Sequence, residues 1–178
     1  MKNKLLPLFA IAIVFFISCS NTSDKNAGEI EEQKALPASS ESKPTLPAFK
    51  IRTADGSTIN MEELKGKKVF LNLWATWCPP CKAELPSIEK LYQKVDKANT
   101  VFLMLSLDEN FETAKKFAAA GKINLPVYAP GETLPEMFNT GSIPATFIFN
   151  EEGEMIKMIS GMDDYDTDEY VQLLTSKK

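Results

Sequence analysis

The sequence predicts an α/β fold in which a central mixed β-sheet carries helices on both faces. Two observations support this prediction. Apolar runs typical of strands alternate with segments of helical periodicity between about residues 46 and 175. The last two apolar runs flank Glu152-Gly153, which predicts an antiparallel hairpin. The 178 residues therefore contain one folded domain of about 130 residues and an N-terminal tail.

The folded part is expected to begin with a small β-hairpin. Apolar residues on both sides of Asp55-Gly56 predict this hairpin, because such a dipeptide favours a tight turn. Asn60 is a suitable helix N-cap with Glu63 three residues later, and Gly66 ends the short helical turn that follows.

The remaining elements follow from apolar periodicity. A continuous apolar run at 101–107 indicates a buried central strand, since strands covered on both faces do not alternate. Gly121 is expected to end one helix, and Asp166 with Glu169 to cap the last one. In chain order the sequence predicts strands at 69–74, 101–107, 125–129, 145–149 and 155–159, and helices at 79–98, 111–120, 132–139 and 166–175.

Composition and charge exclude several classes of function. The net charge is −4 and no basic stripe is present, which argues against nucleic-acid binding. The chain contains no histidine, so it lacks a Cys-His or Ser-His catalytic pair and any histidine-ligated zinc or haem. Lys82 stands where haem attachment to a CxxC motif would require histidine. No metal site is expected.

The chemistry centres on Cys78 and Cys81, which lie between an apolar strand and a helix. Two thiols in the first helical turn can close a disulfide and reopen it, and the helix dipole favours a thiolate there. Cys78, at the helix start, is expected to be the nucleophile and Cys81 the resolving thiol. Pro79 is tolerated in the first turn, and Pro80 stiffens the loop. The sequence thus predicts a thiol–disulfide exchange protein that needs no cofactor beyond its own cysteine pair.

The N-terminus is expected to serve export and anchoring. Lys2 and Lys4 precede an apolar stretch at 5–17, which is too short for a comfortable bilayer span and is typical of a secretory signal. The following Ser18-Cys19 resembles a bacterial lipobox, which implies cleavage before Cys19 and lipidation of that residue. An uncleaved anchor and a plain soluble export signal remain alternatives.

The segment after Cys19 is rich in Ser, Lys, Glu, Ala and Pro and almost lacks large apolar side chains. Such a composition buries too little surface to offset the entropy lost on ordering, so it predicts a disordered tether. The predicted organisation is therefore a lipoprotein signal peptide at 1–18, a tether at 19–45 and one folded domain at 46–178.

Several motifs together resemble the thioredoxin fold: Trp74-Ala75-Thr76-Trp77-Cys78-Pro79-Pro80-Cys81, Pro86 in the following helix, and Ile143-Pro144 before a strand. The extra helix and strand at 111–129, the Lys-Gly-Lys-Lys stretch at 65–68 and Glu84 are similar to the membrane-tethered TlpA/ResA-type thiol–disulfide oxidoreductases. The resemblance covers roughly residues 46–175. It implies a thioredoxin fold with an N-terminal β-hairpin and a central α/β insertion.

The resemblance implies modulating roles for two residues near the cysteines. Asn72 stands where cytosolic thioredoxins carry a buried aspartate thought to take the proton of the second cysteine, and an amide cannot fill that role. Glu84, three residues after Cys81 on the same helical face, is implied to tune or deprotonate that thiol. The alternative for Glu84 is a solvated helix carboxylate.

Substrate contacts are implied on both sides of the cysteines. Pro144 is expected to form a cis peptide bond facing the disulfide, which leaves the backbone of Ile143 free to pair with a substrate strand. The alternative is an ordinary turn before a strand. Trp77 is expected at an exposed apolar docking rim together with Pro79 and Pro80, whereas the other tryptophan packs in the core.

The resemblance implies an exported, membrane-anchored monomer that reduces protein disulfides on the periplasmic side of the bacterial cell envelope, in cell redox homeostasis. It would draw electrons from a membrane electron-transferring reductant, and reduction of apocytochrome c in cytochrome c maturation is the best-known task of such proteins. Two prolines between the cysteines, in place of the histidine of strong oxidants, favour reduction. The alternatives are a disulfide oxidase or isomerase of the same fold and a non-enzymatic CxxC binding module.

Overall fold

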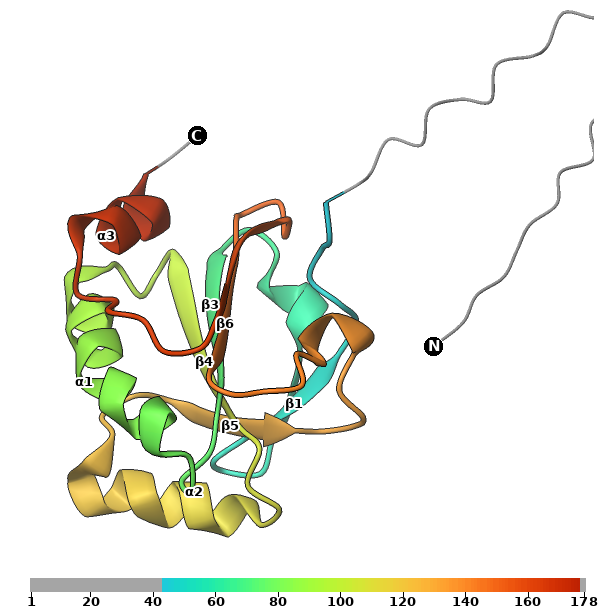
Figure 1. Cartoon of the computed structure of the whole chain (residues 1–178). Helices are drawn as coiled ribbons and strands as arrows, with labels where there is room; N and C mark the ends of the chain where they lie inside the picture. Colours follow the sequence, from blue (N-terminus) through green and yellow to red (C-terminus); the bar gives the residue numbers. More distant parts are fainter. Residues whose placement is uncertain (1–42, 177–178) are drawn as a thin grey trace, which may run out of the picture. The chain divides into compact units, whose positions relative to one another are not determined.

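A computed structural model describes residues 43–176, which form a seven-stranded mixed β-sheet with helices packed against it (Figure 1). The strand order is β2-β1-β5-β4-β3-β6-β7. The neighbours β3 and β4, and β4 and β5, are parallel, and all other pairings are antiparallel. The strands are β1 (Lys50–Thr53), β2 (Thr58–Asn60), β3 (Lys68–Trp74), β4 (Thr100–Ser106), β5 (Val127–Pro130), β6 (Ala145–Phe149) and β7 (Met155–Ser160). The helices are α1 (Pro79–Lys94), α2 (Phe111–Phe117) and α3 (Asp168–Thr175), with the short helical turns η1 (Met61–Leu64), η2 (Ala118–Lys122) and η3 (Glu136–Phe138).

Strand β3 is buried along its whole length and separates two halves of the core. Its side chains alternate between the faces of the sheet. Phe70 and Trp74 pack into the cluster that contains α1, whereas Leu71 and Leu73 pack into the opposite cluster. Because β3 pairs with β4 on one side and β6 on the other, the strand end that leads to the cysteines is held by backbone hydrogen bonds on both sides.

All three α-helices pack over one face of the sheet. Figure 1 shows α1 and α3 on the left of the strands and α2 below them. That face buries Ile88 of α1, Ala114 of α2 and Leu174 of α3. The other face is covered by short 3-10 turns, through Met61 of η1 and Phe138 of η3. The predicted mixed α/β sheet is confirmed, and the helices on its second face are short.

Two predicted helices end earlier than expected. Helix α1 ends at Lys94 instead of residue 98, because Val95 adopts an extended conformation and buries its side chain. The α-helical part of α2 ends at Phe117, and the chain continues as the wide turn η2. Gly121 lies in this turn at φ +70°, a left-handed conformation that favours glycine, so it ends the helical segment as predicted.

Two predictions for the last third of the chain are wrong. The expected helix at 132–139 is reduced to η3, because Pro135 disfavours a helical conformation at the residue before it. Asp166 does not cap α3, which begins at a later residue. Its carboxylate instead pairs with Lys90 and Lys94 of α1, at 2.9 and 2.5 Å, so a tertiary ion pair replaces the predicted local cap.

Both predicted hairpins are confirmed. Strands β1 and β2 pair across Asp55-Gly56, and β6 and β7 pair across Glu152-Gly153. The start of the described chain also pairs with the second hairpin: Thr45 forms a bridge with Glu154, and the backbone N–H of Leu46 donates to Gly153 O at 2.7 Å. Contacts of the domain therefore begin just before residue 46.

The predicted signal peptide, the predicted lipidation site Cys19 and nearly all of the predicted tether lie outside the described residues. Within residues 43–176, none of the helices combines the length and the apolar character that a bilayer span requires.

Candidate active site

The two cysteines of the CxxC motif lie at the junction of β3 and α1 and form a disulfide, with their Cα atoms 5.3 Å apart. Cys78 is the N-cap of α1, and its sulfur accepts the backbone N–H of Cys81 at 3.2 Å. After reduction, this N–H and the helix dipole stabilise a thiolate at Cys78. Pro79 occupies the first helical position, where no backbone N–H is needed. The geometry therefore favours Cys78 as the reactive sulfur.

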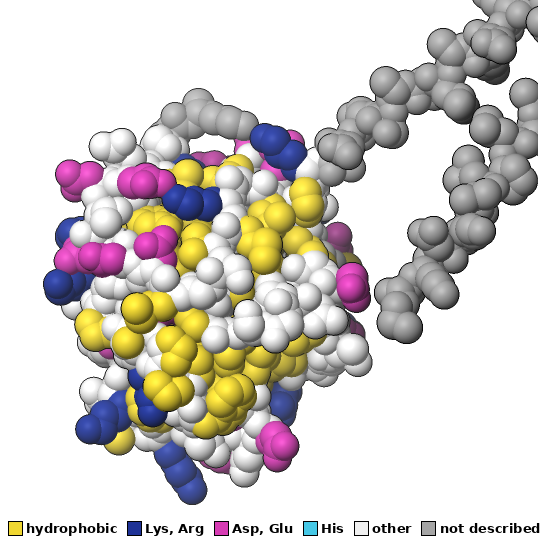
Figure 2. Space-filling view, viewed as in Figure 1, with side chains coloured by type: hydrophobic (Ala, Val, Ile, Leu, Met, Phe, Trp, Pro, Cys, Tyr) yellow, Lys and Arg dark blue, Asp and Glu magenta, His cyan; other side chains and the backbone are white. Residues whose placement is uncertain are grey.

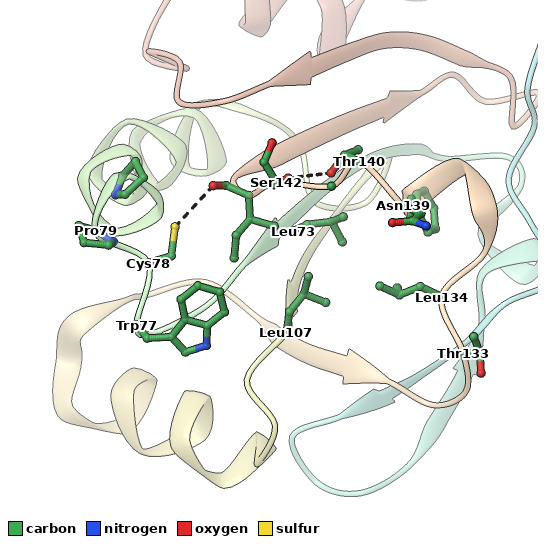
Figure 3. A pocket seen from close by; sticks show the side chains of 14 residues that line it. Leu73, Trp77, Cys78, Pro79, Leu107, Thr133, Leu134, Asn139, Thr140 and Ser142 are labelled. Atoms are coloured by element: carbon green, nitrogen blue, oxygen red, sulfur yellow. Dashed lines mark hydrogen bonds between the residues drawn. The ribbon is translucent and has the colours of Figure 1, made fainter.

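Access distinguishes the two sulfurs. Both cysteines are buried, with 3% of Cys78 and 0% of Cys81 exposed, but Cys78 lines a groove of about 830 Å³ and Cys81 does not. Figure 3 shows the Cys78 sulfur toward one end of this groove, with Trp77 beside it and Leu107 and Leu134 farther along. A partner that enters the groove meets Cys78, and Cys81 lies behind it.

The groove is apolar and contains no charged side chain in its lining. Its walls come from the ends of β3 and β4, the start of α1 and the segment 133–143. Of the predicted contact residues, Trp77, Pro79, Pro80 and Ile143 line the groove, whereas Pro144 does not. Figure 2 shows hydrophobic side chains gathered over the lower half of this side of the molecule, with Lys and Arg at its lower edge. A charge bound here would lose water without gaining a partner, so the groove favours uncharged ligands.

The segment that borders the groove beside the sulfur carries a cis peptide bond between Ile143 and Pro144, as the resemblance implied. Ile143 O lies 3.8 Å from Cys78 Sγ. A disulfide sulfur carries no proton, so this contact is not a hydrogen bond in the oxidised protein. After reduction, the Cys78 thiol can donate a hydrogen bond to Ile143 O. The backbone N–H of Gly161 donates to Pro144 O at 2.9 Å. The cis-proline segment is thus held next to the reactive sulfur by the end of β7.

The two tryptophans beside the motif differ in exposure, as predicted. Trp77 is 64% exposed, whereas Trp74 is fully buried. The loop that joins them is held by Asp108, whose carboxylate accepts the Thr76 N–H at 3.1 Å and the Thr76 hydroxyl at 2.6 Å. Sequence reasoning missed Asp108, because only the parallel pairing of β3 with β4 brings it to the loop before the cysteines.

Glu84 lies one helical turn after Cys81 and is buried, with 2% of its surface exposed. Oε1 accepts from Asn72 Nδ2 at 2.8 Å, and Oε2 accepts from the backbone N–H of Asp163 at 3.3 Å. Burial is the largest influence on the pKa of Glu84 and raises it to about 7, against these two hydrogen bonds, which favour the ionised form. Glu84 is therefore not a solvated helix carboxylate, and it exchanges its proton near neutral pH.

Two further polar residues join Asn72 and were missed from the sequence. Asn72 Nδ2 donates to Thr146 Oγ1 at 2.9 Å, and the Tyr165 hydroxyl donates to the same oxygen at 2.6 Å. All three residues are fully buried. A signal was present, since Asn72 and Thr146 interrupt the apolar runs of β3 and β6, but only the register of the two strands shows that they are partners.

Comparison with known proteins identifies the family. The family model for Redoxin matches residues 41–174. The chain belongs to the Redoxin family. The thiol-disulfide oxidoreductase ResA of Bacillus anthracis is 29% identical to this Redoxin over 161 residues, which are 90% of each chain. ResA of Halalkalibacterium halodurans is 26% identical over 176 residues, which are 98% of this Redoxin and 93% of that protein.

Solved structures share the fold of this Redoxin. StoA from Bacillus subtilis matches it with a TM-score of 0.59 and 29% identity, over 75% of this chain and 100% of StoA. A thiol:disulfide interchange protein of the thioredoxin family from Chlorobium tepidum TLS matches with a TM-score of 0.60 and 26% identity, over 74% of this chain and 96% of that one. This Redoxin is a thioredoxin-like, TlpA/ResA-type thiol–disulfide oxidoreductase whose redox-active pair is Cys78 and Cys81. It is an enzyme and not a passive CxxC binding module.

Proposed function

We propose that this enzyme reduces disulfide bonds of other proteins outside the cytoplasm, and that the reduced pair of Cys78 and Cys81 provides the two electrons. One observation carries the proposal: Cys78 faces an uncharged groove, while Cys81 is buried behind it. This asymmetry suits a reaction in which one thiol attacks the client and the other resolves the mixed disulfide.

The reaction consists of two exchange steps. The Cys78 thiolate attacks one sulfur of the client disulfide, a bond forms between Cys78 Sγ and that sulfur, and the second client sulfur leaves as a thiolate that takes up a proton. The Cys81 thiolate then attacks Cys78 Sγ, which closes the enzyme disulfide and releases the first client sulfur as a second thiol. The client gains two electrons and two protons, and the cysteine pair loses them.

Glu84 is the proposed proton acceptor in the second step. Cys81 has no exposed surface, so water cannot take its proton directly. Glu84 follows one helical turn later, and its pKa of about 7 lies where a general base is most effective near neutral pH. In this proposal the Cys81 proton moves to Glu84 as the mixed disulfide is resolved.

The proposed client is an extended, uncharged protein segment bound along the groove. Trp77 offers a large aromatic surface at the rim, and Pro79, Pro80 and Ile143 add apolar contacts. Ile143 O lies 3.8 Å from Cys78 Sγ, and a client strand is proposed to pair with the backbone of Ile143 beside the reactive sulfur. Recognition is therefore proposed to depend on apolar contact and backbone hydrogen bonds instead of charge.

Reduction, and not oxidation, is proposed because two prolines and no histidine stand between the cysteines. Proteins of this architecture span reduction potentials from about −270 mV to about −120 mV. A potential below about −200 mV in a glutathione titration supports the reductase. A potential above about −150 mV would favour the alternative, a disulfide oxidase or isomerase of the same fold.

We also propose that residues 1–45 export and anchor the enzyme. A signal peptide at 1–18, a lipidated Cys19 and a tether would hold a monomeric domain at the periplasmic side of a bacterial membrane. There a membrane electron-transferring reductant would return two electrons to the disulfide, and apocytochrome c is the proposed client. The support is the lysine-flanked apolar stretch that ends at Cys19. The Cys19→Ala variant should leave the membrane fraction, and its retention there would contradict the lipid anchor.

Trapping tests the two-step mechanism. Cys81→Ser keeps the attacking thiol but cannot resolve, so cells that express this full-length variant should accumulate mixed disulfides between it and client proteins. Cys78→Ser is the matched control and should trap none. Equal trapping by both variants, or none by Cys81→Ser, would contradict the assignment of Cys78 as the attacking sulfur.

A further inference from the structure

We propose that Asn72, fixed in place by Thr146 and Tyr165, is the positioning residue that holds the Glu84 carboxylate ready to accept the proton of Cys81. The inference rests on the proposed role of Glu84 and extends it to three residues that have no thiol chemistry of their own. Strand β3 carries the amide, and the carboxylate comes from α1, the helix that faces it.

The hydrogen bonds around Glu84 form a closed ring. Its carboxylate accepts from Asn72 Nδ2 at 2.8 Å, and the second proton of that nitrogen goes to Thr146 Oγ1 at 2.9 Å. Thr146 Oγ1 also accepts from the Tyr165 hydroxyl at 2.6 Å. The backbone N–H of Tyr165 donates to Ser87 Oγ at 3.2 Å, and the Ser87 hydroxyl donates to Glu84 O at 2.8 Å. The ring returns to the residue where it begins and joins β3, β6, α1 and the segment before α3.

The direction of the hydrogen bonds is set at Thr146. The Tyr165 hydroxyl donates to Thr146 Oγ1 at 2.6 Å, and burial, which raises the pKa of this hydroxyl above its usual range, keeps it protonated as the pH rises. The remaining lone pair of that oxygen accepts a hydrogen bond from Asn72 Nδ2. The amide therefore turns its nitrogen toward both Thr146 and Glu84, and the carboxylate receives a donor from the strand.

An unpaired atom shows what Asn72 contributes. Asn72 Oδ1 is buried and has no hydrogen-bond partner in the part of the chain that the structure describes. A buried acceptor without a donor destabilises a fold, and an apolar side chain on this strand would avoid that penalty. The amide is therefore explained by its two N–H donors and not by packing.

The charges around Glu84 make the amide donor important. Within residues 43–176, no lysine or arginine forms an ion pair with Glu84. The titratable groups near it are Cys81 on its own helix, and Asp163 and Tyr165 on the segment before α3. The residues that β3 and β6 contribute to this network are the uncharged Asn72 and Thr146. Burial and the charge of Asp163 disfavour the ionised carboxylate. The Asn72 amide is thus the side chain that opposes them.

The test follows the second exchange step with dithiobis-nitrobenzoate, an aromatic disulfide that releases a coloured thiolate. The Cys19→Ala change is placed in every variant, so that the full-length reduced protein has only the two active-site thiols. The first release reports attack by Cys78, and the second reports resolution by Cys81. In the protein whose only change is Cys19→Ala, the rate of the second release should rise with pH and show an inflection near pH 7. Adding Glu84→Gln should abolish this inflection.

Asn72→Ala removes a donor to the ionised carboxylate, so the pKa of Glu84 rises. The inflection should move upward by about one pH unit, and the second release should slow about ten-fold at pH 6 while approaching the wild-type rate at pH 9. Thr146→Val should shift the inflection in the same direction, because the amide loses its anchor. Thr146→Ser keeps the hydroxyl and should retain the wild-type profile.

Each outcome decides between defined alternatives. In the Glu84→Gln background, Asn72→Ala should cause no further change in the pH profile, because the group through which it acts is gone. An unmoved inflection in Asn72→Ala, with Glu84→Gln still abolishing it, overturns the inference and leaves the proposed base intact. An inflection that persists in Glu84→Gln would show that Glu84 is not the proton acceptor for Cys81. If Asn72→Ala fails to fold, as judged by the loss of a cooperative urea unfolding transition, the comparison of Thr146→Val with Thr146→Ser decides.

Discussion

Glu84→Gln should remove a pH dependence of the folding free energy that the buried carboxylate imposes. In the folded protein, burial raises the pKa of Glu84 from 4.5 to about 7, whereas the unfolded chain titrates near the ordinary value. Between these pH values the folded protein binds more protons at this site than the unfolded chain, so stability falls as the pH rises. Below about pH 4.5 and above about pH 7 the contribution of Glu84 is constant.

The size of the effect follows from the two pKa values. Each pKa unit corresponds to about 1.4 kcal/mol, so the span from 4.5 to about 7 amounts to about 3 kcal/mol. Because Glu84 is almost fully buried, solvent screens little of this contribution. Relative to Glu84→Gln, the wild type should therefore lose about 3 kcal/mol of stability as the pH rises through this range.

Urea unfolding of the oxidised full-length proteins at a series of pH values measures this loss. The absolute stability of the variant is not the readout, because the glutamine amide gives up one of the hydrogen bonds that the carboxylate accepts from Asn72 and from the Asp163 backbone. The readout is the difference between the two stability curves, in which all other titrating groups cancel. A difference that stays flat from about pH 4.5 to about pH 7.5 would refute the reasoning.

Three other substitutions test the groove and the core. Trp77→Ala should lower kcat/KM for a protein disulfide about 30-fold, as expected when a contact residue worth about 2 kcal/mol is truncated, and an unchanged kcat/KM would remove Trp77 from the docking rim. Leu134→Glu should slow the reduction of a protein disulfide about ten-fold by placing an unpaired charge in the groove. Gln172→Glu, on the exposed side of α3, is the control. Equal rates for both variants would show that clients do not use the groove. Phe70→Ala removes a buried ring whose centroid lies 4.7 Å from that of Phe102 and should lower the free energy of unfolding by about 3–5 kcal/mol in urea titrations, and a loss below about 1 kcal/mol would contradict its place in the core.

The strands and hairpins were predictable because their signals are local. The apolar run at 101–107 corresponds to β4, and the turn residues Asp55-Gly56 and Glu152-Gly153 join the expected strand pairs. The error at Asp166 arose because its side chain had a tertiary alternative. Asp166 has the residue type of a cap, but the two lysines of α1 compete for its carboxylate, and nothing in the sequence around it indicates that they are near.

By itself, the sequence determined the reactive chemistry of this protein. Two cysteines at the start of a helix, in a chain without histidine, are sufficient to indicate a redox pair, and their order predicts Cys78 as the attacking thiol. The resemblance of the surrounding motif indicated the fold and the cis bond before Pro144, both of which the structure contains. These features depend on residue types and spacings within short segments.

Only the tertiary structure decided which groups surround the buried thiol. The antiparallel register of β3 and β6 places Asn72 opposite Thr146, and the packing of α1 on the sheet brings Glu84 to the same amide. The burial that raises the pKa of Glu84 exists only in the folded protein. A pattern along a sequence carries the order of side chains but not their distances across the fold, so the proton chemistry of this site appears only once the strands and the helix are packed.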